Sequence, residues 1–332
     1  MAALELDVVG IGNAMVDVLA RTDDGFLTAQ GLVKGTTALI DAARAESLYG
    51  QMGSGIEMSG GSVANTIAGV ASLGGSGAYI GKVRDDQLGG VFAHDLRSIG
   101  VRFATPASTS GPATARCLIL VTPDAQRTMN TYLGACVDLG PEDIDGSLLD
   151  AAQVTYLEGY LFDPPRAKAA FRGAADIAHK AGRKVSLSLS DPFCVERHRA
   201  DFRTLVHHHI DILFANEIEI CSLYETKDFA AAVAAVRGEC DIAVLTRSAQ
   251  GSVIITPREE VAVAAASVAK VVDTTGAGDL YASGFLFGLT HGMALAACGR
   301  LGSLCAAEII GHFGARPETS LKELAKKAGI PI

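Results

Sequence analysis

The chain has 332 residues, 49% of them hydrophobic, which suffices for one large α/β domain or for a domain with a smaller attachment. Its 28 basic and 37 acidic residues give a formal net charge of −9, which argues against nucleic acid or an anionic membrane as the main partner. The start lacks the basic and apolar regions of a signal peptide, and no apolar run reaches about 18 residues. We therefore expect a cytoplasmic protein.

Short apolar runs with the composition of buried strands recur along the chain. In order, they are residues 6–11, 78–80, 117–121, 154–157, 185–189, 212–215, 242–245 and 253–255. Helix-compatible stretches lie between many of them, such as 166–181, where apolar residues recur near a period of 3.6. Strands that alternate with helices imply βαβ crossovers, so we expect a mainly parallel sheet.

Two early segments, residues 14–40 and 101–133, interrupt this alternation because Thr, Val, Arg and turn residues replace long helical patterns. We expect them to form a small accessory β-sheet. No Pro/Ser-rich linker separates them from the rest, so the prediction is a single domain over 1–332 with this sheet inserted. From about 276 to 313 the chain predicts packed helices.

The strongest chemical signal is the run Asp-Thr-Thr-Gly-Ala-Gly-Asp at 273–279, at a predicted turn between a strand end and a helix. Gly276 and Gly278 allow the backbone to approach an anion, and the first free N–H groups of the helix, from Ala277 onward, point into that space. The Asp279 carboxylate beside this anion hole can accept a proton from a hydroxyl that attacks phosphorus. The alternative is an aspartate that only caps the helix.

This run resembles the signature of the ribokinase-like (PfkB) family of sugar and nucleoside kinases. Residues 60–66, Gly-Gly-Ser-Val-Ala-Asn-Thr, resemble the family's Gly-Gly-x-x-x-Asn element, and residues 216–219 match Asn-x-x-Glu. The resemblance implies a ribokinase-like α/β fold, with a mostly parallel sheet between helices and a small β-sheet lid. It places the anion hole at Gly276, Ala277 and Gly278 and the catalytic base at Asp279.

The resemblance also implies ATP and Mg²⁺. It assigns the nucleotide to Asn216, Thr246, Thr275, Gly276 and Gly278, and the Mg²⁺ to Glu219 through water. An optional K⁺ is expected near Asp273 and Thr275, at a site that residues 311–316 complete. Asn216 and Glu219 follow the run 212–215, hence the C-terminal end of a strand, where ligands bind in open α/β sheets. Without the resemblance, an exposed helix N-terminus explains both residues equally well.

The acceptor site is expected after the first strand. The pattern Gly10-x-Gly12 superficially suggests a dinucleotide fingerprint, but Met15 occupies the position of its third glycine, which argues against a dehydrogenase. In ribokinase-like kinases this segment supplies the acceptor pocket, so the resemblance implies that Asp17 accepts hydrogen bonds from vicinal sugar hydroxyls, with Asn13 as its neighbour. An exposed aspartate at a strand end is the alternative.

The combined pattern resembles the adenosine kinase branch more than ribokinase or fructokinase. In that branch the ribose is surrounded by Asn13, Asp17, Gly60, Gly61, Ser62 and Asn65. Tyr160 or Phe162 then stacks on a purine, unless both belong to the core. Arg127 resembles the lid-edge arginine that reaches the transferred phosphate, with an ordinary solvated arginine as the alternative.

We therefore expect a monomer or homodimer that phosphorylates the ribose 5′-hydroxyl of a purine nucleoside with ATP, most specifically adenosine to AMP. Another nucleoside or sugar as acceptor, such as inosine, guanosine, ribose or fructose, is one alternative, and a catalytically idle nucleotide-binding regulator is another. The tract His207-His208-His209 cannot converge on a metal ion from one helix or strand face.

Overall fold

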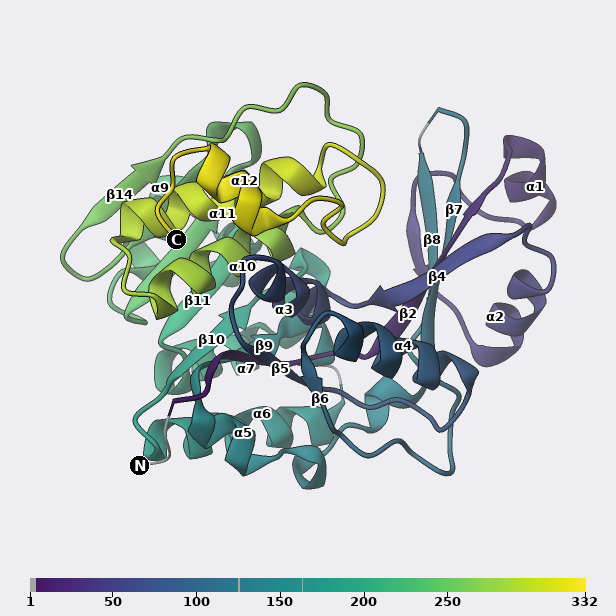
Figure 1. The fold of residues 1–332 in the computed structure, drawn as a ribbon, viewed down its shortest axis with the longest axis horizontal. Helices are drawn as coiled ribbons and strands as arrows, with labels where there is room; N and C mark the ends of the chain where they lie inside the picture. The colour runs from purple at the N-terminus through teal and green to yellow at the C-terminus, as the bar shows by residue number, and fades with distance from the viewer. Residues whose placement is uncertain (1–3, 125, 163) are drawn as a thin grey trace.

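The computed structural model describes residues 4–124, 126–162 and 164–332. The strands form a nine-stranded sheet and a separate five-stranded sheet (Figure 1). The predicted α/β architecture is confirmed, and seven of the eight apolar runs lie within a strand, while the run 185–189 extends one residue beyond the end of β10. The helix predicted at 166–181 is present as α6.

The large sheet has the strand order β14-β13-β12-β11-β10-β9-β1-β5-β6. Its strands are β1 (Leu6–Ile11), β5 (Gly77–Ile80), β6 (Arg102–Phe103), β9 (Ala152–Glu158), β10 (Lys184–Ser188), β11 (Ile212–Asn216), β12 (Ile242–Thr246), β13 (Ser252–Ile255) and β14 (Glu260–Val263). The pairs from β6 to β12 are parallel, and β13 and β14 add an antiparallel edge. The carboxyl ends of the parallel strands therefore meet along one edge of the sheet.

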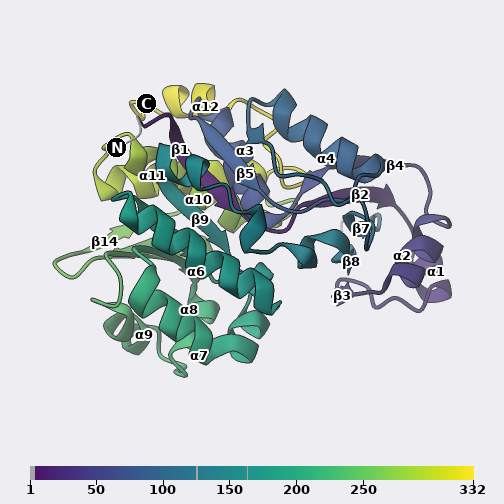
Figure 2. The same ribbon diagram turned by 90° about the horizontal axis from the view of Figure 1, so that it is seen from below.

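Helices cover both faces of this sheet, because successive residues of each strand point to opposite sides. Leu157 and Leu213 belong to one buried cluster with helices α5 (Gly146–Ala151), α6 (Pro165–Lys180), α7 (Pro192–His209), α8 (Glu217–Leu223) and α9 (Phe229–Val236). Tyr156 and Phe214 belong to the other, with α3 (Ser62–Ser72), α10 (Ala277–Thr290) and α11 (Leu295–Ile309). Figure 2 shows these two helical layers on either side of the sheet.

The second sheet has the order β3-β8-β7-β2-β4. Its strands are β2 (Met15–Arg21), β3 (Thr37–Leu39), β4 (Gly55–Gly60), β7 (Ala115–Val121) and β8 (Arg127–Tyr132). Four of them lie in the two segments predicted for a small sheet, whereas β4 lies outside those boundaries and β6 joins the large sheet. The alternation in β4 misleads, because Ser59 is buried while Ile56 is exposed.

The two faces of the second sheet differ. One face packs Val16, Val18, Leu118 and Leu120 under α1 (Asp24–Ala29), α2 (Ala42–Tyr49) and α4 (Gln87–Ser98). In Figure 1, α1 and α2 lie on the side away from the large sheet. The other face, called here the Asp17 face, carries in adjacent register Asp17, Leu19, Leu39, Ile56, Met58, Cys117, Met129 and Arg127.

The C-terminal helix, α12 (Leu321–Lys327), packs beside α3 and α11 in a small third cluster. None of the helices in the described ranges is both long enough and apolar enough to cross a bilayer.

Candidate active site

The loop at 273–279 forms a glycine turn that starts helix α10. Gly276 is the N-cap in the left-handed conformation, with φ of 78°, which glycine adopts without steric cost. The N–H of Ala277 donates to the Thr274 carbonyl at 3.2 Å. This N–H, one of the three at Gly276, Ala277 and Gly278 that were expected to bind an anion, is therefore used inside the turn. Gly278 and Asp279 follow at positions whose N–H groups have no acceptor within a helix. A Cβ atom added to Gly278 would meet nothing within 4 Å, so this side of the turn is open.

The Asp279 carboxylate is bound by helix α3. Its Oδ1 accepts a hydrogen bond from the Ser62 hydroxyl at 2.6 Å, and its Oδ2 accepts one from Asn65 Nδ2 at 3.0 Å. Burial raises the pKa of Asp279, and the two hydrogen bonds partly offset this. Both oxygens of this carboxylate therefore accept hydrogen bonds from side chains of α3. The simple capping alternative therefore does not describe this aspartate.

Asp17 lies in the middle of β2 and is half-buried rather than exposed at a strand end. Its carboxylate packs against the backbone of Gly60, where an added Cβ would lie 2.4–2.5 Å from three carboxylate atoms. Burial raises the pKa of Asp17 to about 6, the charges of Arg316 and Arg127 lower it, and the nearby Asp279 raises it. The two predicted carboxylates therefore lie within electrostatic range of each other.

Asn13 is held by Glu158, a residue that the sequence interpretation did not single out. Asn13 Nδ2 donates to Glu158 Oε1 at 2.7 Å, and the backbone N–H of Val63 in α3 donates to Oε2 at 3.1 Å. Glu158 is 1% exposed, and burial raises its pKa to about 7. An added Cβ on Gly12 would lie 2.3 Å from Oε2, which explains the glycine there. The signal for Glu158 was an acidic residue at the end of a buried strand.

Arg127 reaches from the second sheet to the loop at 273–279. Its Nη2 lies 2.6 Å from Asp273 Oδ2, and the two side chains are only 8% and 6% exposed. The guanidinium also lies over the Phe313 ring, 5.5 Å from its centroid. Within the part of the chain that the structure describes, Arg127 Nε has no hydrogen-bond acceptor. The alternative of a solvated arginine is therefore excluded.

The chain matches a known protein family. Residues 35–322 match the model of the pfkB family of carbohydrate kinases. The chain belongs to the pfkB family. As a member, it is a kinase, a phosphotransferase that acts on an alcohol group, and its fold is ribokinase-like, as the sequence predicted.

Individual relatives of this pfkB-family chain include both nucleoside and sugar kinases. The structure of adenosine kinase from Sinorhizobium meliloti is 53% identical, with a TM-score of 0.91 over 98% of this chain and 99% of that one. A probable sugar kinase from Rhizobium etli CFN 42 is 51% identical, with a TM-score of 0.92 over 99% and 100%. Adenosine kinase from Saccharomyces cerevisiae is 25% identical over 92% of this chain and 95% of the yeast protein. The resemblance to the adenosine kinase branch is thereby supported.

Asn216 and Glu219 join at the start of α8 in a reciprocal capping box. Glu219 N–H donates to Asn216 Oδ1, and the backbone and side-chain nitrogens of Asn216 donate to the two Glu219 oxygens at 2.9 and 2.6 Å. Burial raises the pKa of Glu219 to about 7. Thr246 ends the neighbouring strand in register with Asn216. The pair thus lies at a helix N-terminus, at the edge where ligands bind, but Glu219 is buried and not exposed as that alternative assumed.

The carboxylates of Glu219 and Asp273 differ in how well they fit the expected cations. Within the described ranges, no three His, Cys, Asp or Glu side chains converge on one point that could hold a metal. Each Glu219 oxygen accepts one hydrogen bond and retains a lone pair, which fits a magnesium ion held through water. Asp273 accepts from Thr275 N and Oγ1 and from Gly314 N, and it pairs with Arg127. That carboxylate does not fit a potassium ion in this arrangement.

The two aromatic residues expected near a purine base differ in their burial. Phe162 is fully buried and stacks on Phe202 with ring centroids 4.5 Å apart, so it belongs to the core. Tyr160 is 45% exposed, yet desolvation and the charges of Asp191 and Asp279 raise its pKa, which places it beside the site. Phe193, which the sequence interpretation missed, is 68% exposed at the start of α7.

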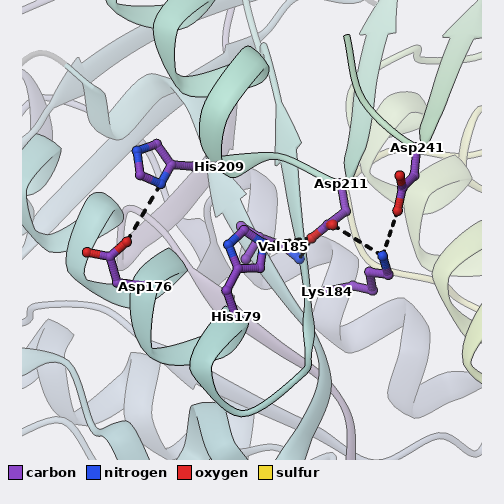
Figure 3. A network of polar contacts seen from close by, with 7 residues as sticks. All are labelled: Asp176, His179, Lys184, Val185, His209, Asp211 and Asp241. Atoms are coloured by element: carbon purple, nitrogen blue, oxygen red, sulfur yellow. Dashed lines mark hydrogen bonds and ion pairs between the residues drawn. The ribbon is translucent and has the colours of Figure 1, made fainter. Parts of the chain in front are cut away.

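The histidine tract lies at the opposite edge of the large sheet, where β10 and β11 begin (Figure 3). His209 Nδ1 lies 3.8 Å from Asp176, while His179 Nε2 lies 2.9 Å from Asp211. Asp211 also pairs with Lys184 at 3.2 Å. The histidines at this edge are thus distributed over separate acidic partners, far along the strands from the glycine turn.

Proposed function

We propose that the chain transfers the γ-phosphoryl group of ATP to the 5′-hydroxyl of a purine nucleoside, with adenosine as the preferred acceptor. One observation carries the proposal: the β4–α3 segment contacts both candidate carboxylates. Gly60 packs against Asp17, and Ser62 and Asn65 bind Asp279. An acceptor whose vicinal hydroxyls bind Asp17 therefore has its remaining hydroxyl directed toward a base.

Asp279 is proposed as the general base. Its two hydrogen bonds from α3 hold the carboxylate in one orientation, and burial raises its proton affinity above that of an exposed aspartate. The acceptor hydroxyl passes its proton to this carboxylate as its oxygen attacks the γ-phosphorus. The bond from the γ-phosphorus to the bridging oxygen breaks, and ADP leaves.

The glycine turn and Arg127 are proposed to bind the transferring phosphoryl group. The N–H groups of Gly278 and Asp279 lie at the positive end of α10, and the space beside Gly278 is open. Arg127 brings a buried guanidinium to the same loop, with an Nε–H still available among the described contacts. When bound, Mg²⁺ neutralises charge on the β- and γ-phosphates, and Glu219 would hold it through water.

The apolar character of the Asp17 face favours a nucleoside over a free sugar. Beside Asp17 this face presents Leu39 and Ile56, which are 66% and 65% exposed. Tyr160 and Phe193, which follow the carboxyl ends of β9 and β10 in the chain, are also exposed aromatic residues. A free sugar has no apolar ring to cover these side chains, whereas a purine base does. The high similarity to the Sinorhizobium meliloti adenosine kinase agrees with this choice.

The second sheet is proposed to act as the lid of a single kinase domain. The ion pair of Arg127 with Asp273 joins this sheet to the phosphate-binding loop. A sheet held there covers the acceptor and excludes water, which limits hydrolysis of ATP.

The test is an ADP-release assay with adenosine, inosine, guanosine, ribose and fructose, performed on the wild type and on Asp279→Asn. We expect adenosine to have the highest kcat/KM and the substitution to lower kcat by about 10²–10⁴-fold, the usual contribution of a general base. Asp24→Asn is the matched control, because Asp24 also lies in the first turn of a helix, α1, in the second sheet region. Faster turnover of ribose than of adenosine defeats the acceptor assignment, and full activity of Asp279→Asn defeats the mechanism.

A further inference from the structure

Arg316 bridges the two sides of the junction between the second sheet and the core. The chain leaves the sheet at Gly60, the last residue of β4, and α3 begins two residues later. On the sheet side, Nε and Nη2 of Arg316 donate to the Ser59 carbonyl at 3.1 and 3.0 Å, and Nη2 also donates to the Ser59 hydroxyl at 3.0 Å. On the core side, Nη1 donates to the Ala64 carbonyl at 2.6 Å. One guanidinium therefore connects both sides.

The junction itself consists of two glycines that provide little restraint of their own. Gly61 has φ of 93°, a conformation that other residues rarely adopt, and an added Cβ would lie 2.3 Å from the Asn13 carbonyl oxygen. Glycine has the largest freedom of backbone rotation, so a diglycine connection allows the flanking elements to reorient. The planar, preorganised donors of Arg316 supply the restraint that these residues lack.

The loop that carries Arg316 also lies against the phosphate-binding turn. The Ala315 Cβ would be 3.0 Å from a Cβ on Gly276, and Gly314 N donates to Asp273 Oδ2 at 3.4 Å. The loop is thus in contact with the segment that positions the base. Arg316 and the loop that carries it therefore connect β4, α3 and the start of α10.

The titratable groups that face the guanidinium come from four elements: the carboxyl groups of Asp17 on β2, Asp95 on α4 and Asp279 on α10, and the phenol of Tyr79 on β5. Burial lowers the pKa of Arg316 to about 10, which still leaves it charged at neutral pH. Asp95 also accepts a hydrogen bond from Ser59 N at 2.8 Å, so it holds the same residue from the other side. Arg127 on β8 is a second cation close to Asp17.

We propose that Arg316 is a positioning residue, which clamps Ser59 to Ala64 across the Gly60–Gly61 junction and so sets the placement of Asp17 relative to Asp279. Its positive charge also stabilises both carboxylates as anions. The inference rests on the proposed function, in which Asp17 binds the acceptor and Asp279 takes its proton. It adds a residue that touches neither the acceptor nor the phosphoryl group.

The test compares Arg316→Gln and Arg316→Lys with the wild type. Arg97→Gln is the matched control, because Arg97 also directs two nitrogens, at 3.1 and 2.9 Å, onto one carbonyl, that of Phe103. We expect Arg316→Gln to lower kcat/KM for adenosine by about 100-fold, the usual cost of misplacing a reacting group by about 1 Å. Without the cation, Asp17 and Asp279 bind protons more tightly, so the acidic limb of the pH profile of kcat/KM moves to higher pH by about one unit.

Lysine retains the charge but not the fork. Arg316→Lys should therefore restore the wild-type acidic limb while kcat/KM stays about 10-fold low, and Arg97→Gln should match the wild type in both measurements. If Arg316 had only a structural role, its substitution would lower the thermal midpoint of unfolding and leave the pH profile of kcat/KM of the folded enzyme unchanged. If the acidic limb of Arg316→Gln stays at the wild-type pH, the proposal is overturned. If the glutamine variant does not fold, a wild-type kcat/KM in Arg316→Lys overturns it instead.

A failure of the proposed function can be distinguished from a failure of this inference. If the wild type phosphorylates another alcohol instead of adenosine, the acceptor assignment falls, and the Arg316 series is measured with that alcohol. The position of its acidic limb then decides the inference in the same way.

Discussion

The ion pair between Arg127 and Asp273 is expected to hold the second sheet against the loop at 273–279, and Arg127→Met tests this. Methionine retains much of the apolar volume but removes the charge. The Asp273 carboxylate then keeps its hydrogen bonds from Thr275 and Gly314 only. We therefore expect a less stable protein and slower phosphoryl transfer.

The size of the loss follows from the burial of the pair. Removing one partner of a buried ion pair costs about 3–5 kcal/mol, and the neutral donors that remain around Asp273 reduce this to about 2 kcal/mol. For 332 residues, about 2.1 cal/mol/K of unfolding entropy per residue amounts to about 0.7 kcal/mol/K. The thermal midpoint should therefore fall by about 3 °C.

A double-mutant cycle with Asp273→Asn measures the coupling through the free energy of unfolding in urea. We expect a coupling of at least about 1 kcal/mol, because the residues are in contact. It should persist between about 0.05 and 0.5 M NaCl, since salt screens a buried pair weakly. Arg102→Met is the control, because its pair with Glu5 is 3.3 Å long and more than half exposed. Additivity of the two substitutions within about 0.3 kcal/mol would refute the reasoning.

Two further predictions concern stability. Burial raises the pKa of Glu158 from 4.5 to about 7, so the folded state binds this proton more tightly and the free energy of unfolding falls as pH rises through that window. Glu158→Gln, which pairs with Asn13 once that amide flips, should flatten this fall in urea titrations at several pH values, and an unchanged slope contradicts the assignment. Gly61→Ala should lower stability by at least about 2 kcal/mol in thermal unfolding, because of its positive φ and the contact with Asn13. Gly173→Ala, with open space on α6, should instead stabilise by about 0.5–1 kcal/mol, and equal effects of the two substitutions would disprove the strain argument.

Features whose parts are consecutive in the chain could be predicted from the sequence. The eight apolar runs identified strands because a buried strand needs only a short apolar segment. The turn at Gly276 could be located because its glycines, the helix start and Asp279 follow one another. Even here, the alternative of a capping aspartate was removed only by the contacts from Ser62 and Asn65, more than 200 residues away.

Features that depend on distant partners could not be predicted in this way. The strand β4 was missed because its apolar Ile56 faces an open side while the polar Ser59 is buried against Asp95 and Arg316. Glu158 gained its role only through Asn13, 145 positions earlier. In both cases a buried polar group finds its hydrogen bonds in another element.

By itself the sequence determined that this chain is an α/β kinase with a glycine turn at the start of a helix, because those properties reside in local patterns and short motifs. Only the tertiary structure decided which side chains act together. The packing of α3 against α10 brings Ser62 and Asn65 to Asp279, and the second sheet brings Arg127 to Asp273. These pairings arise because buried charged and polar groups must be satisfied by whichever partners the folded chain places beside them.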